Sequence, residues 1–490
     1  MQLSASDFYT YYSPHRCERR VFLRHNGAPE EQASPYEEVL RRLGERHERA
    51  HLSTLGEVVD LSGGNREERR RRTREEVEKK ARAIYQPAFA ATVNLAGEPC
   101  QVVGEPDFLV WTDSGYIIQD SKMSRRVNEK EHPEILAQIG TYGLLYEANF
   151  GLPPAGLQVH SGAGEIIDVP YEPNSVRAQL SDLCTVKRRV EEPFGAVGWT
   201  KCLSCPFRSH CWAEAEAKKA VALVYGVDEN LAFALHDYKV DSVDQLLSRF
   251  TVDTLSEFTR PWGAKMQRVG KKAADIMLMA KAFSTNTQIV LRVPQVPDVP
   301  NYVMFDLEGM PPQLQELDKV YLWGMQVFGE KLSTYMPTVA GFGPEGERQG
   351  WLSFLEKASL LFSYYGEIPF VHWADYEATH VKACMARYGD EGGIGARVLK
   401  NLVNLLPIAR DSIALPLPSY SLKVIEKYIG FKRTQVEYGG DWSMAKFIEA
   451  TETQNKEERA EVMNQILLYN EEDLGATWAV LKWLKQIRLN

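Results

Sequence analysis

Three cysteines close together in the sequence constrain the fold of this chain more than any other feature. Cys202, Cys205 and Cys211 lie within ten residues of one another. A C-x₂-C loop commonly presents two sulfurs to one metal, and Cys211 can supply a third. The remaining ligand must come from a distant part of the chain, so a bound metal would join segments that are far apart in the sequence. His210 is an alternative ligand in a zinc site.

The length and the charge of the chain set its broad class. A chain of 490 residues exceeds what one hydrophobic core usually organises, which predicts two or three domains. The net charge of −9 gives no general attraction to phosphates, so nucleic-acid binding requires local basic clusters or metal ions. The N-terminus does not resemble a signal peptide, and no run of about 18 apolar residues occurs. We therefore expect a cytoplasmic protein without membrane contact.

The cysteines fit this compartment. Thiols stay reduced in the cytoplasm, so clustered cysteines are better candidates for metal ligands than for disulfides. Cys100, Cys184 and Cys384 stand alone in the sequence and are expected to be packed thiols.

Hydrophobic patterning predicts an α/β multidomain protein with three parts. The first part, 1–215, carries short strand-like runs at 91–95, 102–111 and 116–120 and a helix at 133–147. Its arginine-rich run at 66–72 is interpreted as a solvated helix face rather than a phosphate-binding patch.

The other two parts differ from each other in pattern. The second part, 216–290, is predicted to be a helical linker, and its segment 268–274 faintly resembles a helix-hairpin-helix element. The third part, 291–490, begins with strands at 302–305 and 319–328 and then alternates strand and helix, which is typical of an α/β domain.

Two acids and a lysine are expected on neighbouring strands of the first part. A hairpin with its turn at Gly115 would bring Asp107 and Asp120 side by side, and Lys122 would point to the same face as Asp120. Carboxylates prefer hard cations such as Mg²⁺ or Mn²⁺, which activate water, and the lysine can stabilise the transition state. This pattern suits phosphodiester hydrolysis.

Further residues of the first part strengthen that interpretation. His47 lies on a preceding predicted helix, and Gln138 and Tyr142 lie one turn apart on a following one. With Gly104-x-Pro-Asp107 and Asp120-x-Lys122, they resemble the RecB-type branch of the PD-(D/E)XK nucleases, which have a restriction-endonuclease-like core. The resemblance implies metal ligands at Asp107, Asp120 and His47, a catalytic Lys122, and substrate-facing Gln138 and Tyr142.

The same resemblance extends to the cysteines. The RecB-type family, like the CRISPR-associated iron–sulfur exonucleases, has one cysteine before the nuclease fold and three after it. This arrangement assigns Cys17 as the fourth ligand beside Cys202, Cys205 and Cys211, and implies a 4Fe-4S cluster. Structural zinc (Zn²⁺) is the alternative, because spacing alone does not distinguish a four-cysteine zinc site from an iron–sulfur cluster. In either case the metal would stabilise the domain.

A second set of acids comes from three separate segments of the third part. Asp306 and Glu308 alternate on a predicted strand and face one side. Glu377 follows a later strand, and Tyr469 and Asp473 lie one turn apart on a helix. Four acids and a tyrosine are what a two-metal phosphoryl site requires.

This ordered set resembles the DEDD 3′→5′ exonucleases of the DnaQ-like, RNase H-fold superfamily, in the subtype with Tyr-x-x-x-Asp. The segment 419–430 is similar to the family's helix between its second and third motifs. By resemblance, Asp306, Glu308, Glu377 and Asp473 hold two metals, and Tyr469 positions the attacking water. The middle motif departs from the family's His-Asn-x-x-Phe-Asp, because His372-Trp-Ala-Asp-Tyr-Glu377 stands in its place. Asp375 is then a candidate helix cap.

The order of the two resemblances along the chain is similar to that in a family of uncharacterised prokaryotic RecB-like nucleases. We therefore expect a nuclease, specifically an exodeoxyribonuclease, with Mg²⁺ or Mn²⁺ at two hydrolytic sites. It would act on DNA ends or single strands in repair, recombination or defence, with RNA also open as a substrate and no particular protein partner predicted. Two alternatives are a single-site nuclease whose RNase H-like domain is a nucleic-acid-binding scaffold, and a CRISPR adaptation nuclease.

Overall fold

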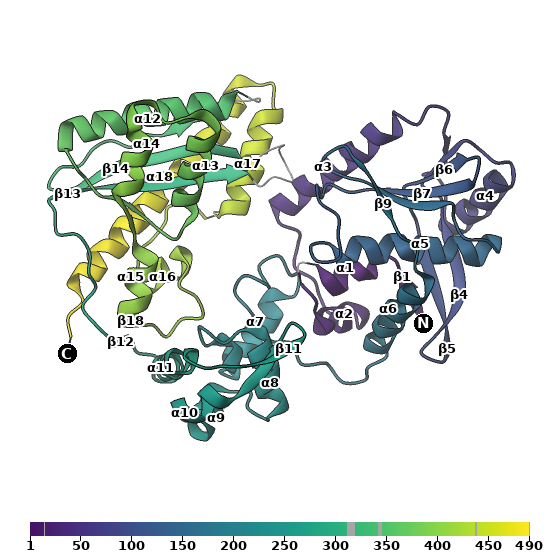
Figure 1. Cartoon of the computed structure of the whole chain (residues 1–490), viewed down its shortest axis with the longest axis horizontal. Coiled ribbons are helices and arrows are strands. Elements are labelled where there is room, and N and C mark those ends of the chain that lie inside the picture. The colour runs from purple at the N-terminus through teal and green to yellow at the C-terminus, as the bar shows by residue number, and fades with distance from the viewer. Residues whose placement is uncertain (14, 311–318, 342–344, 437–438, 490) are drawn as a thin grey trace. The chain divides into compact units, whose positions relative to one another are not determined.

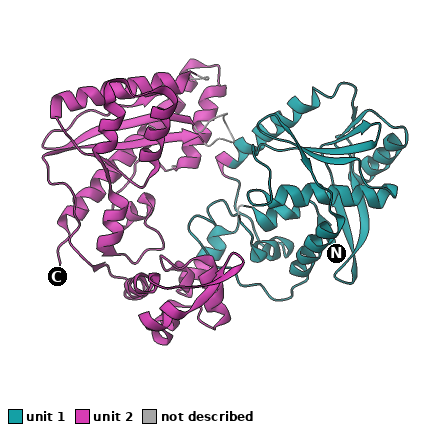
Figure 2. Ribbon diagram, viewed as in Figure 1, with its two compact units in different colours: residues 1–33, 37–212 teal, residues 34–36, 213–490 magenta. Residues whose placement is uncertain are grey.

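The computed structural model describes residues 1–13, 15–310, 319–341, 345–436 and 439–489. Two compact units make up the chain: 1–33 with 37–212, and 34–36 with 213–490 (Figure 2). Within the described residues, no helix is both long enough and apolar enough to span a membrane. The segment 216–290, predicted as a helical linker, lies in the second of these units.

The first unit alternates helices with short strands (Figure 1). Its elements are β1 (Gln2–Ser4), α1 (Asp7–Tyr12), α2 (Glu18–His25), α3 (Pro35–Leu52), β2 (Val59–Asp60), α4 (Arg66–Glu78), β3 (Ala83–Tyr85), β4 (Phe89–Leu95), β5 (Glu98–Gly104), β6 (Phe108–Thr112), β7 (Gly115–Ser121), α5 (Pro133–Phe150), β8 (Gly156–His160), β9 (Ile166–Val169), α6 (Pro173–Lys187) and the first part of α7 (Arg208–Ala217), which continues into the second unit.

These strands form two sheets, in the orders β1-β5-β4 and β2-β3-β6-β7-β8-β9. The single strand expected at 102–111 is therefore wrong: β5 lies in the smaller sheet and β6 in the larger one. Pro106 lies between them and has no amide N–H for a sheet ladder, so the chain changes sheets there. The helix α5 is buried along most of its length, as expected for a helix that is apolar on nearly all sides.

The second unit begins with a mainly helical segment and continues as an α/β domain. Its elements are η1 (Val221–Leu223), α8 (Glu229–Asp237), α9 (Val243–Arg249), α10 (Val252–Glu257), β10 (Thr259–Trp262), β11 (Lys265–Arg268), α11 (Lys272–Thr285), β12 (Ile289–Val290), β13 (Asn301–Met310), β14 (Lys319–Gly329), β15 (Thr338–Val339), α12 (Gly346–Tyr365), β16 (Phe370–His372), α13 (Tyr376–Tyr388), η2 (Glu391–Gly393), α14 (Ile394–Lys400), β17 (Leu402–Asn404), α15 (Leu405–Ser412), β18 (Ile413–Ala414), α16 (Leu422–Tyr428), α17 (Gly440–Glu452) and α18 (Lys456–Gln486).

The segment 216–290 differs from the expectation of helices alone. Its strands β10 and β11 form an antiparallel hairpin with a two-residue turn in which Gly263 has a φ of +59°. Each strand spans only four residues, and Pro261 lies in one of them. So short a hairpin containing a proline gives little strand signal in the sequence.

A five-stranded sheet, in the order β15-β14-β13-β16-β17, forms the centre of the α/β domain. β13 pairs antiparallel with β14 and parallel with β16. Side chains of β13 alternate between its two faces: Phe305 stacks on Phe354 of α12, whereas Tyr302 contacts Trp478 of α18. Asp306 continues the face that meets α18, since it accepts a hydrogen bond from Asn470.

Candidate active sites

The first group of acids lies where β6 and β7 run side by side. Phe108 pairs with Gln119, so the adjacent residues Asp107 and Asp120 are neighbours, as the sequence predicted. Asp107 Oδ2 accepts a hydrogen bond from the Ser121 amide at 2.7 Å. Burial and then the charge of Asp120 raise the pKa of Asp107 well above its ordinary value. Such a carboxylate pair favours a nearby cation.

The ammonium group of Lys122 lies beside Asp107 and Asp120. Its Nζ lies 2.6 Å from Asp120 Oδ2 and 5.6 Å from the centre of the Tyr9 ring. Burial alone would lower the pKa of Lys122, but the charges of Asp120, Tyr9 and Asp107 raise it well above its ordinary value. The ammonium therefore stays charged beside the carboxylates. Sequence reasoning missed Tyr9, whose pKa burial raises to about 12.

His47 and its neighbour Glu48 have different surroundings. His47 Nε2 lies 3.2 Å from the His160 carbonyl oxygen, and its ring stacks on that of His160 with centroids 4.4 Å apart. Gln86 Nε2 donates to Glu48 Oε1 at 2.7 Å and to Asp107 Oδ1 at 3.3 Å. The charge of Glu48 also contributes to the raised pKa of Asp107. Glu48 is thus an acid near this site that sequence reasoning missed, although it directly follows His47.

Gln138 and Tyr142 lie within the buried helix α5. Gln138 Nε2 donates to the Tyr142 hydroxyl at 2.8 Å, and both side chains are buried. Burial, followed by the charge of Asp120, raises the pKa of Tyr142 well above its ordinary value. The structure thus brings the phenol near the acids, and contact of either residue with substrate stays a prediction.

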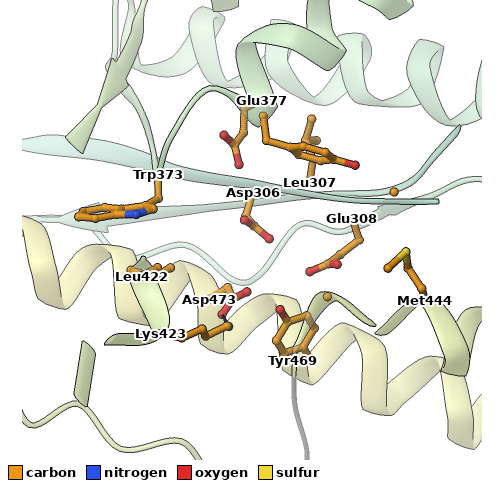
Figure 3. Close-up of a pocket in the computed structure, with 13 residues that line it drawn as sticks. Asp306, Leu307, Glu308, Trp373, Glu377, Leu422, Lys423, Met444, Tyr469 and Asp473 are labelled. Carbon is orange, nitrogen blue, oxygen red and sulfur yellow. Dashed lines mark hydrogen bonds and ion pairs between the residues drawn. The ribbon is translucent and has the colours of Figure 1, made fainter. Parts of the chain in front are cut away.

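The second group of acids lines a cavity of about 480 Å³ in the second unit (Figure 3). Carboxylate oxygens of Asp306, Glu308 and Asp473 lie within 4.8 Å of one another. Burial raises the pKa of Asp306 well above its ordinary value, and the charge of Asp473 adds to this effect. Burial likewise raises the pKa of Glu308 well above its ordinary value, and the charges of Asp306 and Asp473 add to this effect. Three oxygen donors at this spacing fit one hard divalent cation.

Glu377 lines the same cavity from α13. Its Oε2 lies 2.9 Å from His372 Nδ1, and burial raises the pKa of Glu377 to about 8. Burial also lowers the pKa of His372 to about 4. Asp375, the candidate cap, occupies the N-cap position of α13, but its side chain accepts a hydrogen bond from Asn404 Nδ2 at 2.9 Å and caps no helix amide.

Two cations that sequence reasoning missed contact the last acid. Lys423 Nζ and Arg433 Nη2 both form ion pairs with Asp473 Oδ1. Lys423 Nζ also lies 4.5 Å from the centre of the Tyr469 ring, and Tyr469 lines the cavity. The lysine was visible within the segment 419–430, but nothing in the sequence marked Arg433 as a neighbour of Asp473.

Family comparisons match the two units separately. Residues 9–212 match the PD-(D/E)XK nuclease superfamily, and residues 303–485 match the RNase_H superfamily. The chain joins a PD-(D/E)XK domain to an RNase H domain. Both domains belong to nuclease superfamilies, which typically use divalent metals such as Mg²⁺. These two matches support a nuclease, a phosphodiester hydrolase, and imply a nucleic-acid substrate.

Other known proteins add little to this identification. No curated protein matches the chain. A solved structure, the crystal structure of SSO0001, is 16% identical to it over 44% of this chain and 86% of that chain, with a TM-score of 0.22.

The cysteines of the PD-(D/E)XK domain lie close enough for their charges to affect one another. Burial raises the pKa of the Cys211 thiol to about 12, and charges on Cys205, Cys17 and Cys202 contribute. Cys17 is the N-cap of α2 and accepts a hydrogen bond from the Arg20 amide. The early cysteine and the three late ones therefore lie within electrostatic range of one another, and four thiolates would suit a soft metal.

Two other cysteines of the PD-(D/E)XK domain are packed thiols, as expected, and they pack against each other. The Sγ atoms of Cys100 and Cys184 lie 3.2 Å apart in the buried core, so β5 and α6 contact each other through this thiol pair. Sequence spacing gave no sign of this contact, because 84 residues separate the two positions.

Proposed function

We propose that the protein is an exodeoxyribonuclease with two independent hydrolytic sites, one in each nuclease domain. The observation that carries this proposal is the trio of Asp306, Glu308 and Asp473 oxygens within 4.8 Å of one another, lining an accessible cavity. Adjacent acids with a charged lysine in the PD-(D/E)XK domain support a second, separate site.

In the PD-(D/E)XK domain, Asp107 and Asp120 would hold Mg²⁺ or Mn²⁺, together with His47 or Glu48. A bound divalent ion supplies charge neutralisation on the phosphate and a more acidic water. The Lys122 ammonium, held by Asp120, would stabilise negative charge on the phosphate in the transition state. Gln138 and Tyr142 would contact the substrate.

In the RNase H domain, Asp306, Glu308 and Asp473 would hold one metal ion, and Glu377 would join them at a second. His372, the neighbour of Glu377, is neutral at pH 7, because the pKa of its imidazole is about 4. Tyr469 would orient the attacking water, and Lys423 and Arg433 would hold the Asp473 carboxylate in place.

The proposed substrate is DNA with free ends or single strands, as in repair, recombination or defence, with RNA as the alternative. We further propose that Cys17, Cys202, Cys205 and Cys211 hold a 4Fe-4S cluster that stabilises the PD-(D/E)XK domain.

One observation favours a second candidate function, in which the RNase H domain only binds nucleic acid. Lys423 and Arg433 both pair with Asp473, and such pairing competes with a metal for this carboxylate.

The test separates the two sites by single substitutions. Removing one acidic ligand leaves too few carboxylates to hold the metal, which costs several orders of magnitude in rate. We expect Asp120→Ala to abolish cleavage by the PD-(D/E)XK domain while 3′→5′ trimming of single strands persists, and Asp306→Ala to do the reverse. The measurement is product analysis on end-labelled single- and double-stranded DNA with Mg²⁺ or Mn²⁺.

The matched controls are exposed acids outside the sites: Asp113→Ala in the turn between β6 and β7, and Asp411→Ala in the second unit. Neither should change any product. If Asp306→Ala combined with Asp473→Ala leaves every product unchanged while Asp120→Ala removes all cutting, the RNase H domain is a binding module and the two-site proposal fails.

A further inference from the structure

The cavity of the RNase H domain has an apolar wall as well as an acidic one. Trp373, Leu422 and Met444 line it together with the carboxylates. Figure 3 shows Trp373 and Leu422 at one end of the row of acids and Met444 at the other. The acids account for the chemistry on a phosphodiester, but they do not account for a large aromatic side chain beside them.

The backbone holds Trp373 in a defined position. It lies in the loop between β16 and α13, and its indole Nε1 donates to the Tyr420 carbonyl at 3.1 Å. The next residue, Ala374, has a φ of +67°, a left-handed conformation that is costly for a residue with a Cβ. Its amide donates to Asn404 Oδ1 at 3.1 Å. These contacts fix the indole rather than leaving it to rotate freely.

Trp373 is also half-buried. It packs against the hydrophobic core of the second unit, yet it still lines the cavity. An indole supported in this way presents an aromatic surface within the same cavity as Asp306. Aromatic side chains of this kind stack on the bases of single-stranded nucleic acid, and such stacking tolerates any base because every base has a π-face.

We propose that Trp373 is the stacking surface for the nucleobase next to the phosphodiester bond that the RNase H domain cleaves. This inference rests on the proposed function of that domain and specifies its substrate as single-stranded nucleic acid with an unpaired base at the site. The residue stands where the resembled exonuclease family usually has asparagine, so the stacking surface is a feature of this chain rather than of the family pattern. Leu422, which is buried, lines the same end of the cavity (Figure 3).

The experiment compares cleavage of an intact oligonucleotide with cleavage of an oligonucleotide that lacks one base. All variants are built in the Asp120→Ala chain, so that trimming reports the RNase H domain alone. Substrates are single-stranded DNA oligonucleotides that are either intact or carry an abasic residue at one of the last two 3′ positions. The expected wild-type preference for the intact oligonucleotide, as a ratio of kcat/KM values, is about 5- to 150-fold at one of these positions, the range that base stacking supplies.

Trp373→Leu should remove most of this preference by slowing cleavage of the intact oligonucleotide, while the rate on the abasic one stays within about twofold. Trp373→Phe keeps an aromatic ring and should retain most of the preference for the intact oligonucleotide. The matched control is Trp483→Leu, because Trp483 is also half-buried against the same core but does not line the cavity.

Each outcome separates the two ideas. If trimming depends on Asp306 but Trp373→Leu leaves the preference unchanged, or the wild-type site does not distinguish intact from abasic DNA, the stacking inference is wrong and the proposed function stands. The comparison of intact with abasic DNA at the wild-type site needs no Trp373 variant, so misfolding of that variant cannot hide a failure of the stacking inference. If Asp306→Ala leaves trimming unchanged, both the proposed function and the stacking inference fail.

Discussion

Glu377 differs from the other acids of the RNase H cavity in its hydrogen-bond partner. Its carboxyl contacts the His372 imidazole, whose pKa of about 4 leaves it neutral at pH 7. The pKa of Glu377 itself is raised to about 8 by burial. A neutral neighbour does not compensate a buried negative charge, so without a cation this carboxyl retains its proton near neutral pH.

In metal-free protein, Glu377 should make the second unit less stable as pH rises from about 4.5 to about 8. The folded state keeps this proton until about pH 8, whereas an unfolded chain releases it near pH 4.5, so the free energy of unfolding decreases across this window. Glu377→Gln removes the ionisable group. We expect it to raise Tm by more than about 2 °C at pH 8 and to leave Tm unchanged at pH 4.

Differential scanning calorimetry in a chelator measures this effect. Glu367→Gln is the control, because Glu367 is an exposed acid of the same unit and its pKa is lowered by hydrogen bonds from Asn401 and Arg397. An equal pH dependence of Tm in wild type and Glu377→Gln would contradict the prediction.

Sequence spacing predicted acids but not their partners. Asp107 and Asp120 follow from the length of one hairpin, and Asp306 and Glu308 from the period of one strand. Arg433 reaches Asp473 across 40 residues, and such a contact depends on how separate elements pack. No local pattern carries that information, so the cations of the second cavity required the structure.

At the scale of elements, a buried group of charges joins α16, α18 and the segment between α16 and α17. Arg433 donates to both carboxylate oxygens of Glu426 at 2.8 and 2.7 Å and pairs with Asp473. The Arg433 side chain is 3% exposed and that of Glu426 is 1% exposed. Buried charges of this kind are costly unless every member keeps its partner.

Arg433→Met should therefore destabilise the second unit by about 3–5 kcal/mol, because it leaves Glu426 buried without its cation. Adding Glu426→Met to this variant removes the unpaired charge and should recover a substantial part of the loss. Calorimetric or urea unfolding of both variants measures the difference. A single variant within about 1 kcal/mol of wild type, or a double variant no more stable than the single one, would show that the pairing has little energetic role.

Element boundaries show the same division between local and long-range information. Sequence patterning located three elements, because each is a continuous apolar or periodic run: the strands at 302–305 and 319–328 and the helix at 133–147. The separation of β5 from β6 and the hairpin of β10 and β11 were missed. Pro106 lies between β5 and β6 and Pro261 lies within β10, and strand pairing is set by partners that the local sequence does not identify.

Considered as a whole molecule, the chain holds two units whose order along the sequence was predicted from motifs. The helices of 216–290 share one hydrophobic core with α15, α16 and α18 of the RNase H domain. The linker prediction rested on helical patterning without a strand pattern, whereas shared burial depends on apolar faces that only packing reveals. In the first unit, Cys17 lies near the beginning of the domain and Cys211 near its end.

The cysteines should therefore stabilise the first unit as a whole through one metal centre. Thiolate-to-iron charge transfer predicts that anaerobically purified protein is brown, with broad absorbance near about 400 nm. Cys205→Ala should remove the colour and lower the Tm of the first unit, since a cluster bound only by the folded state adds its binding energy to folding. Cys384→Ala, in the core of the second unit, is the control and should keep the colour. Colourless protein that contains one zinc ion would exclude the iron–sulfur cluster and retain a structural metal that joins the two ends of the domain.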